Sequence, residues 1–360
     1  MASFTELGGW SGVLSRVLAG GSLEFAEAEC VMDQVLAGEA TPAQIAGLAV
    51  SLRVKGEAVD EIRGFVAAML AKAESLRVEP DAIDVVGTGG DRLSSINVTT
   101  LAAFIAVGAG ARICKHGGRA ASSSVGTADV LEALGVAVDL GPSGVARCVT
   151  EVGMGFCLAT RYHPAMRHAG PVRRELGIPT VFNFLGPLAN PARVTRQLVG
   201  VSDPAMAPKM ASVLGANGSR RAMVVFADDG LDEISISAPT TVLEVEGDGG
   251  GAFEVRTIRI EPGDVGLPSA ALEDVRGGDA AFNASVIRRV LQGERSARRD
   301  IGVLNAAAAL MISGAASELS VGVALAEASI DGGHALVILD ELVRVSQEAK
   351  AVESATPAPS

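Results

Sequence analysis

A glycine-rich turn between a short apolar strand and a helix constrains the fold of this chain more than any other stretch. Residues 83–86 are apolar and β-branched apart from one aspartate, which is typical of a buried strand. The strand runs into GTGGD at 87–91, where glycines tolerate positive φ and let a ligand approach the backbone closely. Asn97 or Thr99 is a candidate N-cap for the helix that follows. This layout directs backbone N–H groups and a helix dipole at one point, which suits a phosphate.

The glycine loop alone is a weak signal, because it lacks the lysine and spacing of a P-loop and the spacing of a dinucleotide-binding fingerprint. By itself it indicates only a tight turn. Two further stretches strengthen the phosphate interpretation. A second predicted strand, 112–114, ends in the cationic sequence KHGGR at 115–119, and hydroxyl-rich residues 122–127 precede a predicted helix at 128–134. Because parallel strands end at one edge of a sheet, three such loops suit a ligand with more than one phosphate.

Four blocks in this order resemble the anthranilate phosphoribosyltransferase family. They are GTGGD at 87–91, NVTT at 97–100, KHG-R at 115–119, and a hydroxyl residue, Thr127, before ADVLEALG. The resemblance extends over about 14–347 and, with the strand and helix patterns, predicts an α/β fold: a small helical N-terminal domain plus a larger α/β domain with a central, mostly parallel sheet flanked by helices. The expected boundaries are a helical domain at 1–77, completed by a helical segment near 163–180, an α/β domain at 78–350 and a disordered tail at 351–360.

Local patterns give more detailed expectations. Residues 12–75 predict helices, with Ser22 as one N-cap and a capping box at Thr41 and Gln44. Residues 78–160 alternate strand and helix, as in a parallel sheet. The expected elements are strands at 136–138, 156–159 and 222–226, a helix at 144–152 capped by Ser143, a loop-like crossing at 183–191, a β-hairpin within 240–260 and helices from 279 to 347.

An acidic turn follows the strand at 222–226. Four carboxylates within six residues repel one another unless a cation or solvent screens them. A solvated surface turn is the alternative explanation. The sequence GLDEIS resembles the acidic motif of the family, which implies that Asp232 and Glu233 bind Mg²⁺, with Asp228 and Asp229 supporting them or facing solvent. Thr99 stands where the family has a serine that also contacts metal, and the expectation is two Mg²⁺ ions.

The resemblance implies transfer of the phosphoribosyl group from phosphoribosyl pyrophosphate (PRPP) to the amine of anthranilate, a step of tryptophan biosynthesis. Such chemistry requires positioning and electrostatic stabilisation of the leaving pyrophosphate more than acid–base catalysis. Lys115, Asn97 and Arg173 are the implied catalytic residues. The implied PRPP-binding residues are Gly87, Gly90, Asp91, Ser95, Asn97, Val98, Thr99, Thr100, Lys115, His116, Gly117, Ser122, Ser123 and Thr127.

The acceptor site holds the one clear departure from the family pattern. The segment 161–177 resembles the family's acceptor-binding segment, in which Arg173 would hold the anthranilate carboxylate bidentately. The implied anthranilate-binding residues are Gly87, Gly118 and Arg173. Gly118 replaces an asparagine of the family, so weaker anthranilate binding, a water in its place or a different aromatic acceptor all remain open. Pyrimidine nucleoside phosphorylases have a related Lys-x-Ser-Gly-Arg block but lack the acidic pair. His163 and His168 fit capping or packing better than catalysis.

Composition narrows the possible partners. The net charge of −12 disfavours a nucleic-acid surface, and with it a non-catalytic nucleic-acid-binding relative. No uninterrupted apolar run reaches membrane-spanning length, and the N-terminus lacks the features of a signal peptide. The four cysteines show no metal-ligand spacing, as is usual for buried thiols in a reducing compartment. The expectation is a cytoplasmic enzyme of small molecules, homodimeric as the resemblance implies, that binds neither nucleic acid nor membrane.

Overall fold

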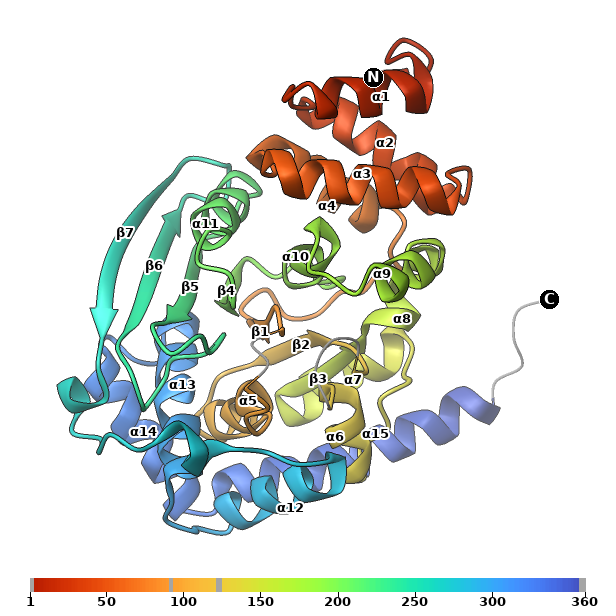
Figure 1. Cartoon of the computed structure of the whole chain (residues 1–360). Coiled ribbons are helices and arrows are strands. Elements are labelled where there is room, and N and C mark those ends of the chain that lie inside the picture. Colours follow the sequence, from red (N-terminus) through yellow and green to blue (C-terminus); the bar gives the residue numbers. More distant parts are fainter. Residues whose placement is uncertain (1–2, 91–92, 121–124, 356–360) are drawn as a thin grey trace.

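The computed structural model of the chain (Figure 1) describes residues 3–90, 93–120 and 125–355. The N-terminal segment is helical, as predicted. Its third helix begins with the predicted capping box, in which the Thr41 N–H donates to Gln44 Oε1 at 2.9 Å and the Gln44 N–H donates to Thr41 Oγ1 at 3.3 Å. The predicted cap at Ser22 is wrong, because its hydroxyl accepts from Lys55 Nζ instead. The four helices are α1 (Gly9–Leu18), α2 (Phe25–Ala37), α3 (Pro42–Lys55) and α4 (Val59–Ala71).

A mixed sheet forms the centre of the larger part, with strand order β1-β4-β5-β6-β7. The first three strands are parallel, and β6 and β7 form the predicted antiparallel hairpin at one edge. A parallel pair, β2 and β3, continues the sheet beside β1 through a bridge between Ile83 and Ile113. The strands are β1 (Asp84–Gly87), β2 (Ile113–Gly117), β3 (Met154–Leu158), β4 (Arg196–Gly200), β5 (Arg221–Ala227), β6 (Thr240–Gly247) and β7 (Phe253–Ile260).

Helices cover both faces of this sheet (Figure 1). Alternate residues of β1 and β4 enter two hydrophobic cores, so that Val85 and Leu198 pack on one side and Val86 and Val199 on the other. The second core is continuous with the N-terminal helices. The remaining helices are α5 (Val98–Gly108), α6 (Thr127–Ala133), α7 (Pro142–Val152), α8 (Ala159–Tyr162), η1 (Pro164–His168), α9 (Gly170–Leu176), α10 (Val181–Leu188), α11 (Ala207–Ala216), η2 (Pro262–Val265), η3 (Leu272–Val275), α12 (Ala280–Leu291), α13 (Ala297–Ser313), α14 (Leu319–Asp331) and α15 (His334–Ala355).

Two predicted elements differ from the structure. Residues 136–138 are buried but form no strand, because the Ala137 N–H donates to Ser346 Oγ of α15 at 3.0 Å instead of to a neighbouring strand. Residues 183–191 were expected to be a loop, yet α10 spans most of them. The Thr180 N–H donates to Asn183 Oδ1 at the start of α10, and its apolar residues are buried. Pro187 lies near the end of the helix, where a missing N–H interrupts little of it.

The last helix is longer than predicted because it caps another helix. Glu353 accepts hydrogen bonds from the Gly141 N–H at 3.0 and 3.1 Å and from the Gly144 N–H at 3.2 Å, at the N-terminus of α7. A carboxylate is favourable there, since it satisfies free N–H groups and the helix dipole. The predicted tail at 351–360 is therefore wrong for 351–355, while 356–360 lie outside the described residues. The predicted cap Ser143 lies inside α7, whose N-cap is Gly141.

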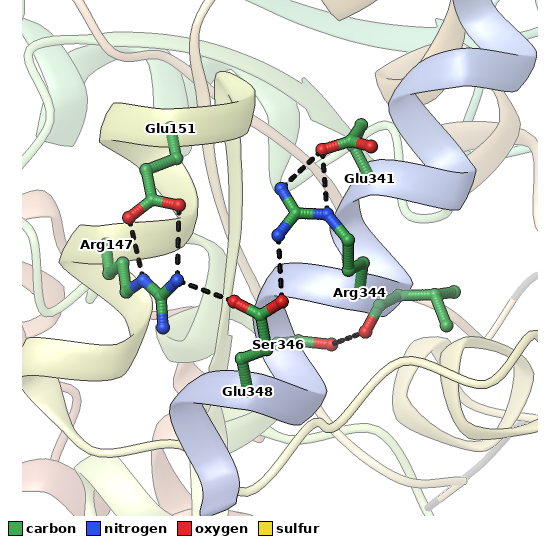
Figure 2. Close-up of polar contacts among 7 residues, drawn as sticks. Arg147, Glu151, Glu341, Arg344, Ser346 and Glu348 are labelled. Atoms are coloured by element: carbon green, nitrogen blue, oxygen red, sulfur yellow. Dashed lines mark hydrogen bonds and ion pairs between the residues drawn. The ribbon is translucent and has the colours of Figure 1, made fainter. Parts of the chain in front are cut away.

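Ion pairs extend the contact between α15 and α7 (Figure 2). Arg147 of α7 pairs with Glu151 and with Glu348, both at 2.7 Å, and Arg344 of α15 pairs with Glu348 at 2.8 Å and with Glu341 at 2.6 Å. Exposed pairs of this kind contribute about 0–1 kcal/mol each. They add to the capping contact but do not replace it.

Among the described residues no single helix is long and apolar enough to cross a membrane. Only α14 and α15 taken together, at an angle of 65°, meet that length and composition.

Replacing the capping carboxylate tests why the C-terminal helix is ordered. We expect Glu353→Ala to lower the free energy of unfolding by about 1 kcal/mol, because two N–H groups of α7 lose their acceptor. Chemical denaturation measures this change. Ser354→Ala is the matched control, since Ser354 is exposed and its hydroxyl bonds to no described residue. Equal stability of the two variants would contradict the capping role.

Candidate functional site

A cavity of about 270 Å³ opens where the C-terminal ends of β1 and β2 meet the start of α5 and the turn after β5. Its wall brings together five stretches, at 86–89, 94–99, 115–119, 125–127 and 232–233. The residues expected from sequence that line it are Gly87, Ser95, Asn97, Val98, Thr99, Lys115, His116, Gly117, Gly118, Thr127, Asp232 and Glu233.

Other expected residues lie elsewhere. Gly90 and Arg173 are not part of the cavity wall. Thr100 is fully buried behind it, and its hydroxyl has no hydrogen-bond partner among the described residues, because the first turn of α5 directs this side chain into the core. Asp91, Ser122 and Ser123 lie outside the described residues.

The acidic turn lies directly against the ends of two strands. The Gly89 N–H donates to Asp232 Oδ2 at 2.7 Å. A Cβ at Gly87 would lie 2.4 Å from Asp232 Oδ2, and a Cβ at Gly200 would lie 1.6 Å from the Asp232 carbonyl oxygen. Glycine is therefore required at 200 for the turn to approach this closely, and a side chain at 87 would displace the Asp232 carboxylate. The approach brings the side chains of Asp232 and Glu233 to the cavity wall, where the two residues are 7% and 8% exposed.

The four carboxylates of this turn divide into two pairs. Asp228 forms an ion pair with Arg259 on β7. Asp229 accepts from the Leu231 N–H at 3.1 Å and from the Ser235 hydroxyl at 2.6 Å. These two residues hold the turn in shape, whereas Asp232 and Glu233 line the cavity.

An asparagine of α13 fixes the far end of the turn. Asn305 is fully buried, accepts from the Ile234 N–H at 2.9 Å and donates to the Ile234 carbonyl at 2.8 Å. Both backbone groups next to Glu233 are thus bound to one rigid helix.

Lys115 places a buried ammonium group at the cavity. Its Nζ donates to the Val85 carbonyl of β1. Burial lowers the pKa of Lys115, while the negative charges of Asp84, Glu233 and Asp232 act in the opposite direction. An anionic ligand in the cavity would add to these charges and stabilise the protonated amine.

Asp84 lies beneath Lys115 as its buried counter-charge. Burial raises the pKa of Asp84 to about 6, although Lys115 and two hydrogen bonds favour the carboxylate. The hydrogen bonds come from Asn190 Nδ2 at 2.8 Å and from the His116 N–H at 3.1 Å. Asn190 also donates to the Cys114 carbonyl at 2.9 Å, and so ties β1 to β2.

The His116 ring is turned toward α10. Its Nδ1 lies 3.0 Å from the Gly186 carbonyl, which can only accept, so Nδ1 carries the proton. The ring centroid lies 5.2 Å from that of His163. Burial, together with His163, lowers the pKa of His116 to about 3. The ring is therefore neutral near pH 7 and supplies no cation for a phosphate.

The surroundings of Gly118 leave room for a side chain. A Cβ there would lie 3.9 Å from Ala159 Cβ, which is an ordinary contact, and the backbone does not adopt positive φ. The neighbouring Arg119 binds Glu132 of α6 at 2.5 and 2.7 Å. Glycine at 118 is thus not required by the backbone, and it leaves space at the cavity wall.

Arg173 is a half-buried cation on α9, a helix that packs against α3 and η1. Burial lowers the pKa of Arg173. No hydrogen bond or ion pair joins its side chain to another residue in the described part of the chain. A guanidinium in this state can bind an anion without first breaking an internal contact.

Comparison with known proteins decides the family. The model of the glycosyl transferase family, a/b domain, matches residues 79–336, and that of its helical bundle domain matches 11–73. The anthranilate phosphoribosyltransferase of Azorhizobium caulinodans is 51% identical over 93% of this chain and 96% of its own length, and that of Thermomicrobium roseum is 52% identical over 92% and 95%. The chain belongs to the anthranilate phosphoribosyltransferase family. The resemblance found in the sequence is thereby confirmed.

Solved structures of the family have the same fold. The Thermus thermophilus enzyme matches with a TM-score of 0.86 at 40% identity, over 93% of this chain and 99% of that chain. The Saccharomyces cerevisiae enzyme in complex with PRPP and Mg matches with a TM-score of 0.85 at 27% identity, over 94% and 98%. The predicted helical domain and mostly parallel α/β domain are confirmed.

The residues that support the cavity wall were not predicted from the sequence. Asp84 and Asn190 act on Lys115 from below, and Asn305 holds the acidic turn. A lone carboxylate inside an apolar strand was a usable signal for Asp84, since a buried charge requires partners. No comparable signal marked the asparagines, whose partners are distant in the sequence.

Adding a methyl group at Gly200 tests the close approach of the acidic turn. We expect Gly200→Ala to lower the free energy of unfolding by about 1–3 kcal/mol, because its Cβ would displace the backbone at Asp232. Denaturant titration measures the change. Gly263→Ala, at an exposed site with no atom within 4 Å of the new Cβ, should alter stability little. A Gly200→Ala protein as stable as this control would contradict the geometry of the turn.

Proposed function

We propose that this chain transfers the phosphoribosyl group of PRPP to the amine of anthranilate, giving N-(5-phosphoribosyl)anthranilate and pyrophosphate, as a Mg²⁺-dependent step of tryptophan biosynthesis. One observation supports this most strongly. Lys115, Asn97 and the pair Asp232 and Glu233 converge on one cavity in a chain of this family. A cation, an amide and two carboxylates suit a metal-bound diphosphate better than a simple monoanion.

The residues present fit Mg²⁺. Asp232 and Glu233 offer adjacent carboxylates, and the Thr99 residue lines the same cavity. The described residues contain no cluster of three or more acidic, histidine or cysteine side chains that could hold a metal ion without further ligands. This matches Mg²⁺, which usually takes one or two protein carboxylates and completes its shell with substrate phosphate and water. When bound, Mg²⁺ would neutralise charge on the pyrophosphate group; two ions are part of the proposal.

The chain's own residues would bind and orient PRPP. The N-terminus of α5 lies at the cavity wall and suits phosphate oxygens. The Lys115 ammonium would pair with the diphosphate, a charged hydrogen bond worth about 1.5–3 kcal/mol. Because His116 is neutral and directed away, it would contribute through its backbone and not as an acid. Positioning and charge stabilisation would then account for most of the rate.

The acceptor would be held by Arg173, whose guanidinium lacks an internal partner and suits a carboxylate. Gly118 would leave space at the cavity wall. That space favours one second candidate, the same transfer to an aromatic acceptor other than anthranilate.

A homodimer through the N-terminal helices is the proposed assembly. An apolar groove of about 340 Å³ between α1 and α3 is flanked by Leu18 and Val54, which are 75% and 83% exposed. Exposed apolar surface of this kind marks an interaction site. We place the enzyme in the cytoplasm, where its four free cysteines would stay reduced.

Chelation tests the metal part of the proposal. We expect EDTA to abolish transfer and Mg²⁺ to restore it, and Glu233→Gln to raise the Mg²⁺ concentration needed at least tenfold, because one ligand charge is lost. Loss of anthranilate fluorescence with PRPP measures the rate. Asp228→Asn is the matched control, since Asp228 belongs to the same turn but pairs with Arg259. Full turnover in chelator would refute the metal requirement.

Removing the unpaired guanidinium tests the acceptor site. We expect Arg173→Ala to raise the KM for anthranilate by about 10- to 100-fold while the KM for PRPP changes little, because one charged contact to the carboxylate is lost. Steady-state kinetics with each substrate varied in turn gives both values. Arg174→Ala, at the exposed neighbouring position, is the control. Equal increases in both KM values would count against a carboxylate contact.

A further inference from the structure

A buried asparagine from the distant helix α12 is bonded to the cavity residue Asn97. Asn283 is 2% exposed, and its Nδ2 donates to Asn97 Oδ1 at 2.9 Å. Asn97 is the N-cap residue of α5, as predicted, but its side chain makes no capping bond to the helix. Instead, the contact with Asn283 is the one hydrogen bond of this side chain to the described residues. Asn97 therefore keeps its remaining amide capacity for the cavity.

The direction of this hydrogen bond is fixed by a backbone group. The Gly278 N–H lies 2.8 Å from Asn283 Oδ1, and an N–H can only donate. Oxygen must therefore face Gly278, and the NH₂ group of Asn283 must face Asn97. The atom of Asn97 on that side must in turn be its oxygen. These two hydrogen bonds leave the NH₂ group of Asn97, which is a donor, free to face a ligand in the cavity.

The strand-like segment before α12 holds this arrangement in place. The Ile96 N–H donates to the Val275 carbonyl at 3.0 Å, and the Gly277 N–H donates to the Ser94 carbonyl at 2.8 Å. A Cβ at Gly277 would lie 2.6 Å from the Ser95 carbonyl oxygen and 2.8 Å from Asn283 Oδ1. The segment thus lies tightly against the loop that precedes α5, and brings Asn283 to Asn97.

We infer that Asn283 is a positioning residue for substrate binding, because it fixes the Asn97 amide with its NH₂ group, and not its carbonyl oxygen, toward the diphosphate of PRPP. The inference rests on the proposed function, in which Asn97 binds that diphosphate. A phosphate oxygen accepts hydrogen bonds, so an NH₂ group attracts it and a carbonyl oxygen repels it. Without Asn283 the amide could adopt either orientation, and binding would carry the cost of selecting one.

A double-mutant cycle tests this inference. The four proteins are wild type, Asn97→Ala, Asn283→Ala and the double variant, and calorimetry gives the Kd for PRPP with Mg²⁺. We expect Asn283→Ala to weaken binding about tenfold in the wild-type background and less than about twofold in the Asn97→Ala background, because its effect passes through Asn97. The KM for anthranilate should stay unchanged. Ser285→Ala, exposed on the same helix, is the control.

Asn283→Asp provides a second variant that keeps the local fold. Its carboxylate still accepts the Gly278 N–H but presents an oxygen to Asn97, which turns the amide over. We expect weaker PRPP binding than in Asn283→Ala, and the same substitution in the Asn97→Ala background measures the effect of the added charge alone.

Three results would decide against parts of the scheme. An unchanged Kd in Asn283→Ala, or an equal loss in both backgrounds, would overturn the positioning role. An Asn283→Asp protein that binds PRPP as tightly as wild type would also overturn the positioning role. A wild-type protein that does not bind PRPP with Mg²⁺ would instead overturn the proposed function itself, which separates the two failures.

Discussion

The buried charge of Lys115 is the constraint on which the rest of the site depends. An ammonium group without solvent costs several kcal/mol unless opposite charges and hydrogen bonds compensate it. Asp84 lies beneath Lys115, and Asp232 and Glu233 lie across the cavity. The acidic turn reaches that position only because Gly87 and Gly200 end their strands without side chains. The glycines therefore allow the turn to supply the negative charge that the buried ammonium requires.

Three buried asparagines connect this charged centre to the surrounding framework. Asn190 binds Asp84 and joins β1 to β2, Asn305 binds the turn next to Glu233, and Asn283 binds Asn97. An amide suits each place because it can donate on one side and accept on the other without adding charge. Fully satisfied buried networks of this kind are rigid, so the cavity wall is held in position before a ligand arrives.

Local sequence patterns were enough to predict the elements around the cavity. The strand at 83–86, its glycine turn, the strand ending at Lys115 and the acidic turn all depend on residues that are neighbours in the chain. The predicted helix caps at Ser22 and Ser143 failed, as did the strand at 136–138, where a side chain of α15 binds the backbone. The predicted tail failed at 351–355 for the same reason, since Glu353 binds the N-terminus of a helix more than two hundred residues away.

In the candidate site, too, features set by neighbouring residues could be predicted, and contacts between distant residues could not. Residues on the cavity wall could be assigned from the spacing of four blocks, but Thr100, one position beyond Thr99, points into the core because of the helical turn. Asn283 could not be predicted, since it lies 186 residues from Asn97 and carries no pattern of its own. Pairings across such distances are fixed by tertiary packing, which one sequence does not reveal.

The affinity of a Lys115→Met protein for PRPP in the presence of Mg²⁺ shows whether the buried ammonium holds the diphosphate. Methionine keeps most of the length of the side chain and removes its charge. A folded Lys115→Met protein, verified by circular dichroism, should bind PRPP about 10- to 100-fold more weakly than wild type, as expected for one lost charged hydrogen bond. An unchanged Kd would show that the buried ammonium does not hold the diphosphate.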